Sequence, residues 1–224
     1  MSLLDDIEPV QARTLPVILL LDTSGSMRED DKIDVLNESV AEMITELASV
    51  DAGHGFITLT LIAFGGDAAE VLQKNVPVGE VEFAPLKAGG RTPMGHALVL
   101  TRELIENRDE ISSKAYRPTI ALVSDGIPVP ALEGELEALA ESDRGSKSSR
   151  FALAVGADAD RTMLAEFASG GDVKEASEAA EIRNFLQWVT NTVTQVTLSI
   201  FDPDVEPQSV SDESIARLQQ DDAF

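Results

Sequence analysis

Three short polar segments contain the side chains best suited to chemistry. They are Asp22–Met27 (DTSGSM), Gly89–Gly95 (GGRTPMG) and Ser124–Gly126 (SDG). Asp22, Ser24 and Ser26 are spaced by two, so a loop that curls around a point turns one carboxylate and two hydroxyls the same way, and Gly25 permits the tight path. All three segments are expected at the carboxyl ends of strands or in the loops above them. We therefore predict that they meet on one face.

These oxygen atoms predict a site for one divalent cation. Mg²⁺ takes about six oxygen ligands and keeps several waters. We expect Ser24, Ser26 and Thr92 to bind the ion directly, and Asp22 and Asp125 to hold its waters. Mn²⁺ or Ca²⁺ are the alternative ions. Because only two formal charges face the cation and one position stays open, an Asp or Glu of a protein partner would complete the site, which is a binding function rather than catalysis.

The hydrophobic pattern predicts alternating strands and helices. Val17–Leu21 is a continuous apolar run, typical of a buried strand. Phe56–Phe64 alternates and then turns at two glycines into Glu70–Val78, which predicts a hairpin with its second strand antiparallel at an edge. The other expected strands are 119–124, 151–155 and 172–176. The expected helices are 31–48, 92–105 with Thr92 as its cap and Pro93 in its first turn, 131–141, 162–168 and 182–193.

This order of elements predicts an α/β fold with a doubly wound, mostly parallel sheet, one antiparallel edge strand and helices on both faces. Its ligand site should lie beyond the carboxyl ends of the strands. We expect an acidic N-terminal segment at 1–13, one domain at 14–201, and an acidic, flexible tail at 202–224.

Composition narrows the class of partner and the compartment. Forty acidic and 17 basic residues give a net charge of -23, which disfavours nucleic acid and anionic membranes as partners. There is no cysteine, hence no disulfide, thiolate metal site or cysteine nucleophile. The acidic N-terminus does not resemble a secretory signal, and the longest apolar run is far too short to span a bilayer. We expect a soluble, cytoplasmic protein.

The motif set resembles a known family. Asp-x-Ser-x-Ser after a buried strand, a Thr in a Gly-rich loop and a later Asp before Gly are similar to the metal-ion-dependent adhesion site (MIDAS) of von Willebrand factor type A (VWA) domains, with a match at Asp22, Ser24, Ser26, Thr92 and Asp125. The resemblance spans roughly Leu15 to Val196. It implies a Rossmann-like fold with a cation on its top face, through which a ligand is captured.

A narrower resemblance is carried by Leu86–Leu98 (LKAGGRTPMGHAL) together with the acidic composition. These features are similar to bacterial tellurite-resistance TerY-type VWA proteins. That resemblance implies a role in a stress-response assembly. Some TerY-type proteins carry a C-terminal metal-binding ribbon, which the absence of cysteine excludes here.

Other interpretations remain beside the binding hypothesis. Asp22–Ser26 alone is also compatible with a turn that caps the next helix, and the full set with a site that binds no ion. A metal-dependent hydrolase or phosphotransferase would need a general base, and we assign no role to the two histidines, His54 and His96. A third possibility is an acidic scaffold in which the metal site is incidental. The sequence predicts neither the partner nor the oligomeric state.

Overall fold

The protein is a three-layer α/β structure around one six-stranded sheet. The computed structural model describes residues 13–128 and 133–201. The strands, in the sheet order β3-β2-β1-β4-β5-β6, are β3 (Ala68–Pro77), β2 (Ile57–Gly65), β1 (Leu15–Asp22), β4 (Thr119–Ser124), β5 (Ser149–Val155) and β6 (Val173–Ala176). All neighbours pair in parallel except β2 and β3, which form the antiparallel hairpin predicted at an edge.

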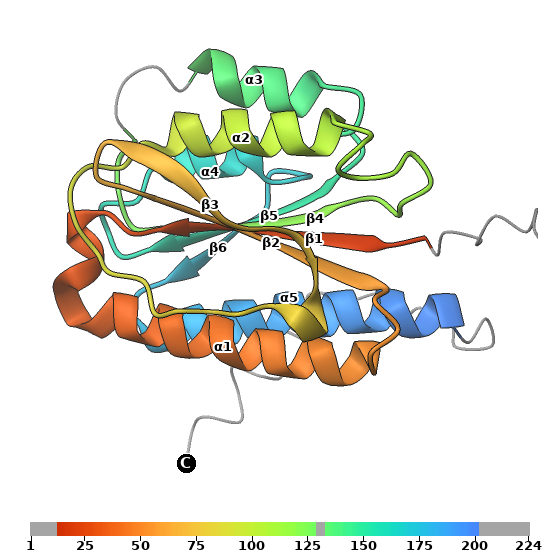
Figure 1. Ribbon diagram of the computed structural model, residues 1–224. Coiled ribbons are helices and arrows are strands. Elements are labelled where there is room, and N and C mark those ends of the chain that lie inside the picture. The colour runs from red at the N-terminus through yellow and green to blue at the C-terminus, as the bar shows by residue number, and fades with distance from the viewer. Residues whose placement is uncertain (1–12, 129–132, 202–224) are drawn as a thin grey trace, which may run out of the picture.

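Helices cover both faces of this sheet, which confirms the predicted fold class. α1 (Lys32–Asp51) and α5 (Ala180–Phe201) lie on one face, and α2 (Met94–Glu106), α3 (Glu133–Glu141) and α4 (Arg161–Phe167) lie on the other (Figure 1). Two short 3-10 turns, Gly25–Asp31 and Val78–Glu80, complete the described elements.

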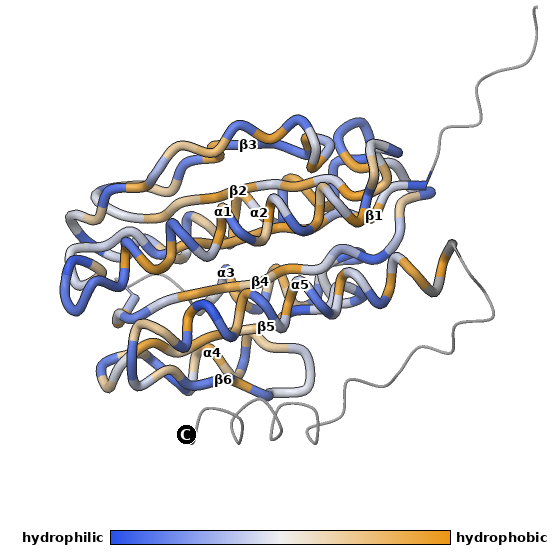
Figure 2. The backbone as a smooth tube through the Cα atoms, turned by 90° about the horizontal axis from the view of Figure 1, so that it is seen from below, coloured by the Kyte–Doolittle hydropathy of each residue, from blue (hydrophilic) through white to orange (hydrophobic). Residues whose placement is uncertain are grey.

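The central strand shows why the sheet must be covered twice. Every residue of β1 is buried. Val17, Leu19 and Leu21 belong to the core beneath α1 and α5, whereas Ile18 and Leu20 belong to the core beneath α2 and α4. Figure 2 shows α1 and α5 on the near side of the sheet, each alternating between hydrophobic and hydrophilic residues. A strand apolar on both sides is stable only between two helical layers.

The predicted stripe of α1 is confirmed. Its six apolar residues are all buried against the sheet: Ile33, Leu36, Val40, Met43, Ile44 and Leu47. The helix continues to Asp51, which is buried. Backbone N–H groups of Gly55, Phe56 and Ile57 donate to it at 2.7 to 2.8 Å. Asp51 thereby fixes the path from α1 into β2.

Both edges of the sheet are irregular or short. The pairing of β3 with β2 shifts its register twice, between Leu59 and Leu61 and between Leu61 and Ile62. Within β3, Asn75 has a φ of 49°, a left-handed conformation. At the opposite edge, β6 has only 4 residues.

One local prediction was wrong. Thr92 does not cap α2: the helix begins at Met94, Pro93 is the flanking residue, and no side chain caps the helix. The carbonyl of Thr92 instead accepts the N–H of Met94 at 2.9 Å. Its hydroxyl is thus free of the helix terminus. The predictions for residues 1–12 and for 202–224 fall outside the described residues.

No helix among the described residues is both long enough and apolar enough to cross a membrane.

Asp51 offers a test of how the fold is held together. We expect Asp51→Ala to lower the free energy of unfolding by about 2–4 kcal/mol, because it strands three backbone donors that a charged acceptor now satisfies. Asp34→Ala removes an exposed carboxylate from the same helix and should cost under about 1 kcal/mol. Urea denaturation of the two variants compares them, and equal losses would contradict this role of Asp51.

Candidate metal centre

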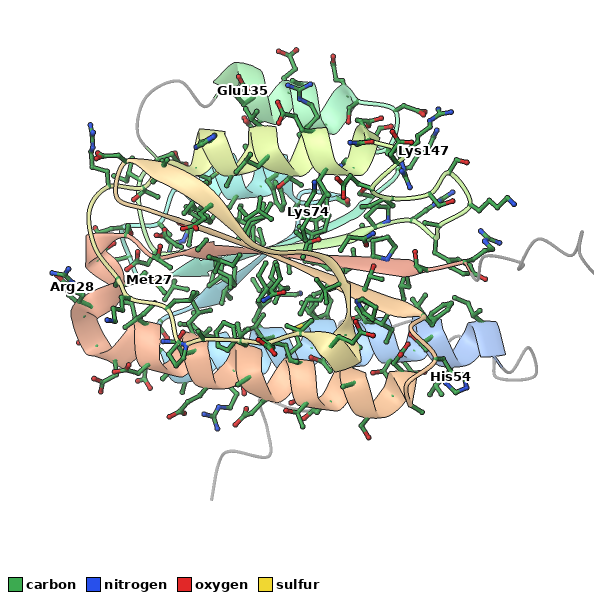
Figure 3. The ribbon with its side chains drawn as sticks, viewed as in Figure 1. Met27, Arg28, His54, Lys74, Glu135 and Lys147 are labelled. Carbon is green, nitrogen blue, oxygen red and sulfur yellow. The ribbon has the colours of Figure 1, made fainter. Side chains whose placement is uncertain are left out.

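The candidate site lies where β1 and β4 end side by side. Leu21 of β1 pairs with Val123 of β4, so the following residues, Asp22 and Ser124, are neighbours. Both side chains are fully buried, and Asp125 is 2% exposed. Figure 3 places Met27, the last residue of the first polar segment, and the next residue, Arg28, at this same end of the sheet. The parallel order of the strands is what brings two segments about a hundred positions apart to one point.

A continuous hydrogen-bond network joins four of the five predicted residues. The backbone N–H of Ser24 donates to Asp22 Oδ1 at 2.8 Å, and the hydroxyls of Ser24 and Ser26 lie 3.0 Å apart. Ser26 Oγ then donates to Asp125 Oδ1 at 2.6 Å. Ser124 Oγ donates to the other carboxylate oxygen of Asp22 at 2.6 Å. The two acids are therefore linked through hydroxyls and do not touch directly.

Thr92, the fifth predicted residue, faces the same place from the third loop. A Cβ atom built on Gly126 would lie 2.9 Å from Thr92 Oγ1 and 3.8 Å from Asp22 Oδ2. Thr92 is 7% exposed, so its hydroxyl lies against the Asp125–Gly126 turn rather than in open solvent. The three polar segments thus converge as predicted, and Gly126 must lack a side chain for Thr92 to approach.

Close backbone contacts hold the Thr92 loop in position. Gly89 N–H donates to the carbonyl of Thr23 at 2.7 Å, and Gly66 N–H donates to the carbonyl of Gly89 at 2.8 Å. Gly90 has a φ of 75°, and a Cβ there would lie 2.3 Å from the Cα of Gly66. Gly25 does not have a positive φ, but its N–H donates to the carbonyl of Gly90, and a Cβ there would lie 3.3 Å from that oxygen.

Sequence reasoning missed one charged partner of the site. Lys32, the first residue of α1, places Nζ 2.8 Å from Asp125 Oδ2, and its side chain is 13% exposed. Two consecutive residues in left-handed conformations, Asp30 (φ 53°) and Asp31 (φ 57°), turn the chain from the 3-10 turn into this helix. Such conformations cost energy for non-glycine residues and often occur near functional sites. Ser124 was recognised as part of its polar segment but was not predicted to bond Asp22.

The electrostatics of the site are dominated by burial. Desolvation raises the pKa of Asp22 from 3.8 to about 6, against the hydrogen bonds from Ser124 and Ser24 that lower it. The negative charge of Asp125 adds to the increase. A cation beside Asp22 would therefore relieve a charge that the fold itself stabilises poorly.

The donors present fit a small hard cation. The side chains of the five predicted residues offer only hydroxyl and carboxylate oxygens, the ligand type of Mg²⁺ and related ions. Within 13–128 and 133–201 no group of three or more His, Cys, Asp or Glu side chains forms a metal cluster, so a site here would rely on hydroxyls. Ser24, Ser26 and Thr92 would be its direct ligands, and Asp22 and Asp125 would act through waters.

Comparison with known proteins places this architecture in a family. Residues 17–127, which include β1, the Thr92 loop and β4 with Asp125, match the family model of the von Willebrand factor type A domain. The chain carries a VWA domain. VWA domains commonly mediate protein binding. A search of curated proteins found no significant match to this chain.

Solved structures share the VWA fold at low sequence identity. The pilus adhesin SpaC of Lactobacillus rhamnosus GG has a TM-score of 0.69 and 13% identity over 84% of this chain and 31% of its own. A von Willebrand factor type A protein of Catenulispora acidiphila has a TM-score of 0.58 and 17% identity, over 82% of this chain and 43% of its own. Proximal thread matrix protein 1 of the mussel byssus, in a structure with a zinc-occupied MIDAS motif, has a TM-score of 0.62 and 17% identity, over 80% of this chain and 48% of its own. This chain thus spans less than half the length of each.

Neither histidine of the VWA domain is placed as a general base for this site. His96 Nδ1 accepts the backbone N–H of Ala69 at 3.0 Å, which binds the first turn of α2 to the start of β3. His54 Nδ1 lies 2.6 Å from the carbonyl of Asp51, at the far end of α1. That neither histidine acts in catalysis stays a prediction.

Lys32 should set the cation affinity of the VWA domain. We expect Lys32→Met to tighten Mn²⁺ or Mg²⁺ binding by about threefold to tenfold, because the charge that now neutralises Asp125 is removed. The same change should lower the stability of the metal-free protein by about 1–3 kcal/mol. Isothermal titration calorimetry measures the first effect, with Lys87→Met, an exposed lysine, as control. Weaker cation binding in Lys32→Met would show that Lys32 supports the site instead.

Asp22 should make the metal-free protein sensitive to pH. Because its pKa is raised, the folded state binds the proton more tightly than the unfolded state; the destabilisation is absent below the unfolded pKa of 3.8, grows up to about 6 and is complete above it. In EDTA at pH 7.5, Asp22→Asn should therefore be more stable than the wild type by up to about 3 kcal/mol, and the gain should largely vanish near pH 4.

Denaturant titrations at the two pH values provide the measurement. Asp158→Asn, which changes an exposed acid, should show no such gain. A loss of stability in Asp22→Asn at pH 7.5 would mean that the hydrogen bonds of the carboxylate outweigh its desolvation.

Proposed function

We propose that this VWA domain captures an acidic side chain of a protein partner through a divalent cation, with Mg²⁺ as the first candidate. The observation that carries the proposal is the convergence of hydroxyls from Ser24, Ser26 and Thr92 on two buried carboxylates, Asp22 and Asp125. This ligand set leaves the cation short of negative charge, and a partner carboxylate supplies it.

The rim of the site supports a protein as the ligand. Ile127 follows the Asp125–Gly126 turn and is 69% exposed, an unusual position for a large apolar side chain. Arg91 precedes Thr92 and has a side chain that is 72% exposed. It forms an ion pair with Asp67, whose side chain is 92% exposed. Ile127 offers an apolar contact and Arg91 a positive charge, both beside the proposed divalent cation. These features suit an acidic peptide segment with a neighbouring apolar residue.

We propose that the function is binding without turnover. A hydrolase or phosphotransferase using the same cation needs a group that removes a proton from the attacking nucleophile. Both histidines make contacts elsewhere, and Lys32 is engaged with Asp125. A chelator-sensitive hydrolysis of phosphoesters that is lost in Ser24→Ala would favour the enzymatic alternative.

We further propose that the domain acts inside a bacterial cell, in a stress-response assembly of the tellurite-resistance type. The support is the Leu86–Leu98 segment, the acidic composition and the absence of cysteine. A scaffold role for the acidic surface, with the cation incidental, is the competing proposal. It differs from the first because chelation would leave its partners bound.

Cation-dependent capture provides the decisive test. Partners retained by the immobilised wild-type protein in Mg²⁺ should be released by EDTA, and Ser24→Ala should retain about tenfold less, because one direct ligand is removed. Ser146→Ala, an exposed serine at the other end of the sheet, is the matched control. Calorimetry of Mn²⁺ binding and thermal melting of each variant separate loss of the cation from loss of the fold.

Two results would contradict the proposal. One is a set of partners that is the same with EDTA as with Mg²⁺, which would favour the scaffold. The other is undiminished cation binding in a folded Ser24→Ala protein, which would place the cation elsewhere.

A further inference from the structure

A polar pocket lies at the opposite end of the sheet from the candidate metal centre. It has a volume of about 220 Å³ and is formed by the segment before β4 and the segment before β5. Six residues provide its polar lining: Arg108, Ser113, Arg117, Asp143, Arg144 and Lys147. In Figure 3, Lys147 and Arg28 mark the two opposite ends of the molecule. The pocket therefore does not share residues or space with the metal centre.

The charge of this pocket contrasts with that of the chain. Four cationic side chains line it against a single carboxylate, in a protein whose net charge is -23. The carboxylate of Asp143 lies 2.5 Å from Lys147 Nζ and 3.9 Å from the guanidinium of Arg108, so it already forms ion pairs with both. Arg117 is exposed, and its guanidinium makes no hydrogen bond or ion pair with any residue that the structure describes. The pocket thus contains positive charge that the surrounding structure does not neutralise.

Arg144 holds the two walls of the pocket in a fixed relation. Its guanidinium donates to the carbonyls of Ile111 at 2.6 Å and Ser112 at 3.1 Å, and its backbone N–H donates to Glu106 Oε1 at 2.7 Å. Desolvation lowers the pKa of Arg144, and the positive charge of Arg108 adds to that decrease, whereas the carboxylates of Glu106 and Asp143 oppose it. The two guanidinium groups are therefore close enough to repel each other, which an anion between them would reverse.

We propose that this pocket binds a phosphate group. A phosphate monoester carries a charge of about -1.5 to -2 at neutral pH and offers three strong acceptor oxygens. The planar donors of Arg108 and Arg117 and the ammonium of Lys147 match that charge and number of acceptors, and Ser113 adds a hydroxyl. A carboxylate, with one charge and two oxygens, would leave part of the positive charge without a partner.

The size of the pocket and the overall charge limit the ligand further. Sites for whole drug-sized ligands have volumes of about 300–1,000 Å³, so this pocket has room for a phosphate group but not for a large molecule attached to it. The strongly acidic remainder of the chain repels polyanions such as nucleic acid and anionic bilayers. A single phosphate group, free or carried by a small molecule or a phosphorylated side chain, is the ligand that fits both limits.

Titration of the full-length protein followed by NMR tests this site independently of the proposed function. Metal-free protein in EDTA is titrated with inorganic phosphate and, separately, with O-phosphoserine at constant ionic strength, so that no cation can mediate binding. We expect saturable shifts of the amides of Ser113, Arg117 and Gly145. Arg117→Met should raise the half-saturating concentration about tenfold, because charge-assisted hydrogen bonds are lost.

Lys114→Met is the matched control. Lys114 is exposed in the same segment but does not line the pocket, so its loss removes one positive charge without removing a ligand group. Its half-saturating concentration should stay within about twofold of the wild type. Tighter binding of O-phosphoserine would assign the pocket to phosphorylated ligands, and equal binding to free phosphate.

Three results would overturn the proposal. The first is the absence of saturable shifts for both ligands, and the second is unchanged binding in Arg117→Met. The third is an equal loss in Arg117→Met and Lys114→Met, which would indicate non-specific attraction of anions. None of these results would affect the metal centre, whose cation binding is measured separately.

Discussion

The burial of two carboxylates at the ends of adjacent strands is the constraint on which the functional end of this VWA domain depends. Asp22 and Asp125 lose their hydration because β1 and β4 are central strands covered on both faces. Buried negative charge is tolerated only with hydrogen bonds or a counter-charge. The serine hydroxyls, Lys32 and a bound cation are three ways to meet the same requirement. The fold thus leaves buried negative charge that a positively charged ligand can neutralise.

The arrangement of the loops decides how well a cation can be bound beside these carboxylates. The Gly89–Gly90 turn is bonded to the backbone on both sides, to Thr23 and to Gly66. Thr92 therefore reaches the site from a segment whose position is set by main-chain contacts and not by a flexible linker. A preorganised site of this kind avoids much of the entropic cost of assembling ligands around an ion.

Much of the fold could be predicted because its signals are local and strong. β1 is a continuous apolar run, and the stripe of α1 repeats at helical spacing, so both follow from single segments. The convergence of Asp22 and Asp125 follows from a general property of parallel sheets, without knowledge of side-chain contacts. Thr92 follows the antiparallel strand β3, and its position depends on the main-chain contacts of the Gly89–Gly90 turn.

The remaining features depend on tertiary contacts that no sequence window contains. The ion pair of Lys32 with Asp125 joins α1 to the loop after β4, and Asp51 accepts N–H groups from two residues before β2 and from its first residue. The freedom of Thr92 from a capping role depends on Pro93, which fixes the chain one residue before the helix begins. In each case the contact that a side chain makes depends on residues outside its own segment.

The irregular and short edge strands of the sheet have a consequence for how this domain associates with other proteins. Strand addition requires a long, regular row of free main-chain groups, and neither the twice-shifted β3 nor the four-residue β6 presents one. Such edges also discourage the stacking of copies into fibres at high concentration. If the proposed function holds, recruitment would take place at the tips of the loops, where removal of a single ion would reverse it.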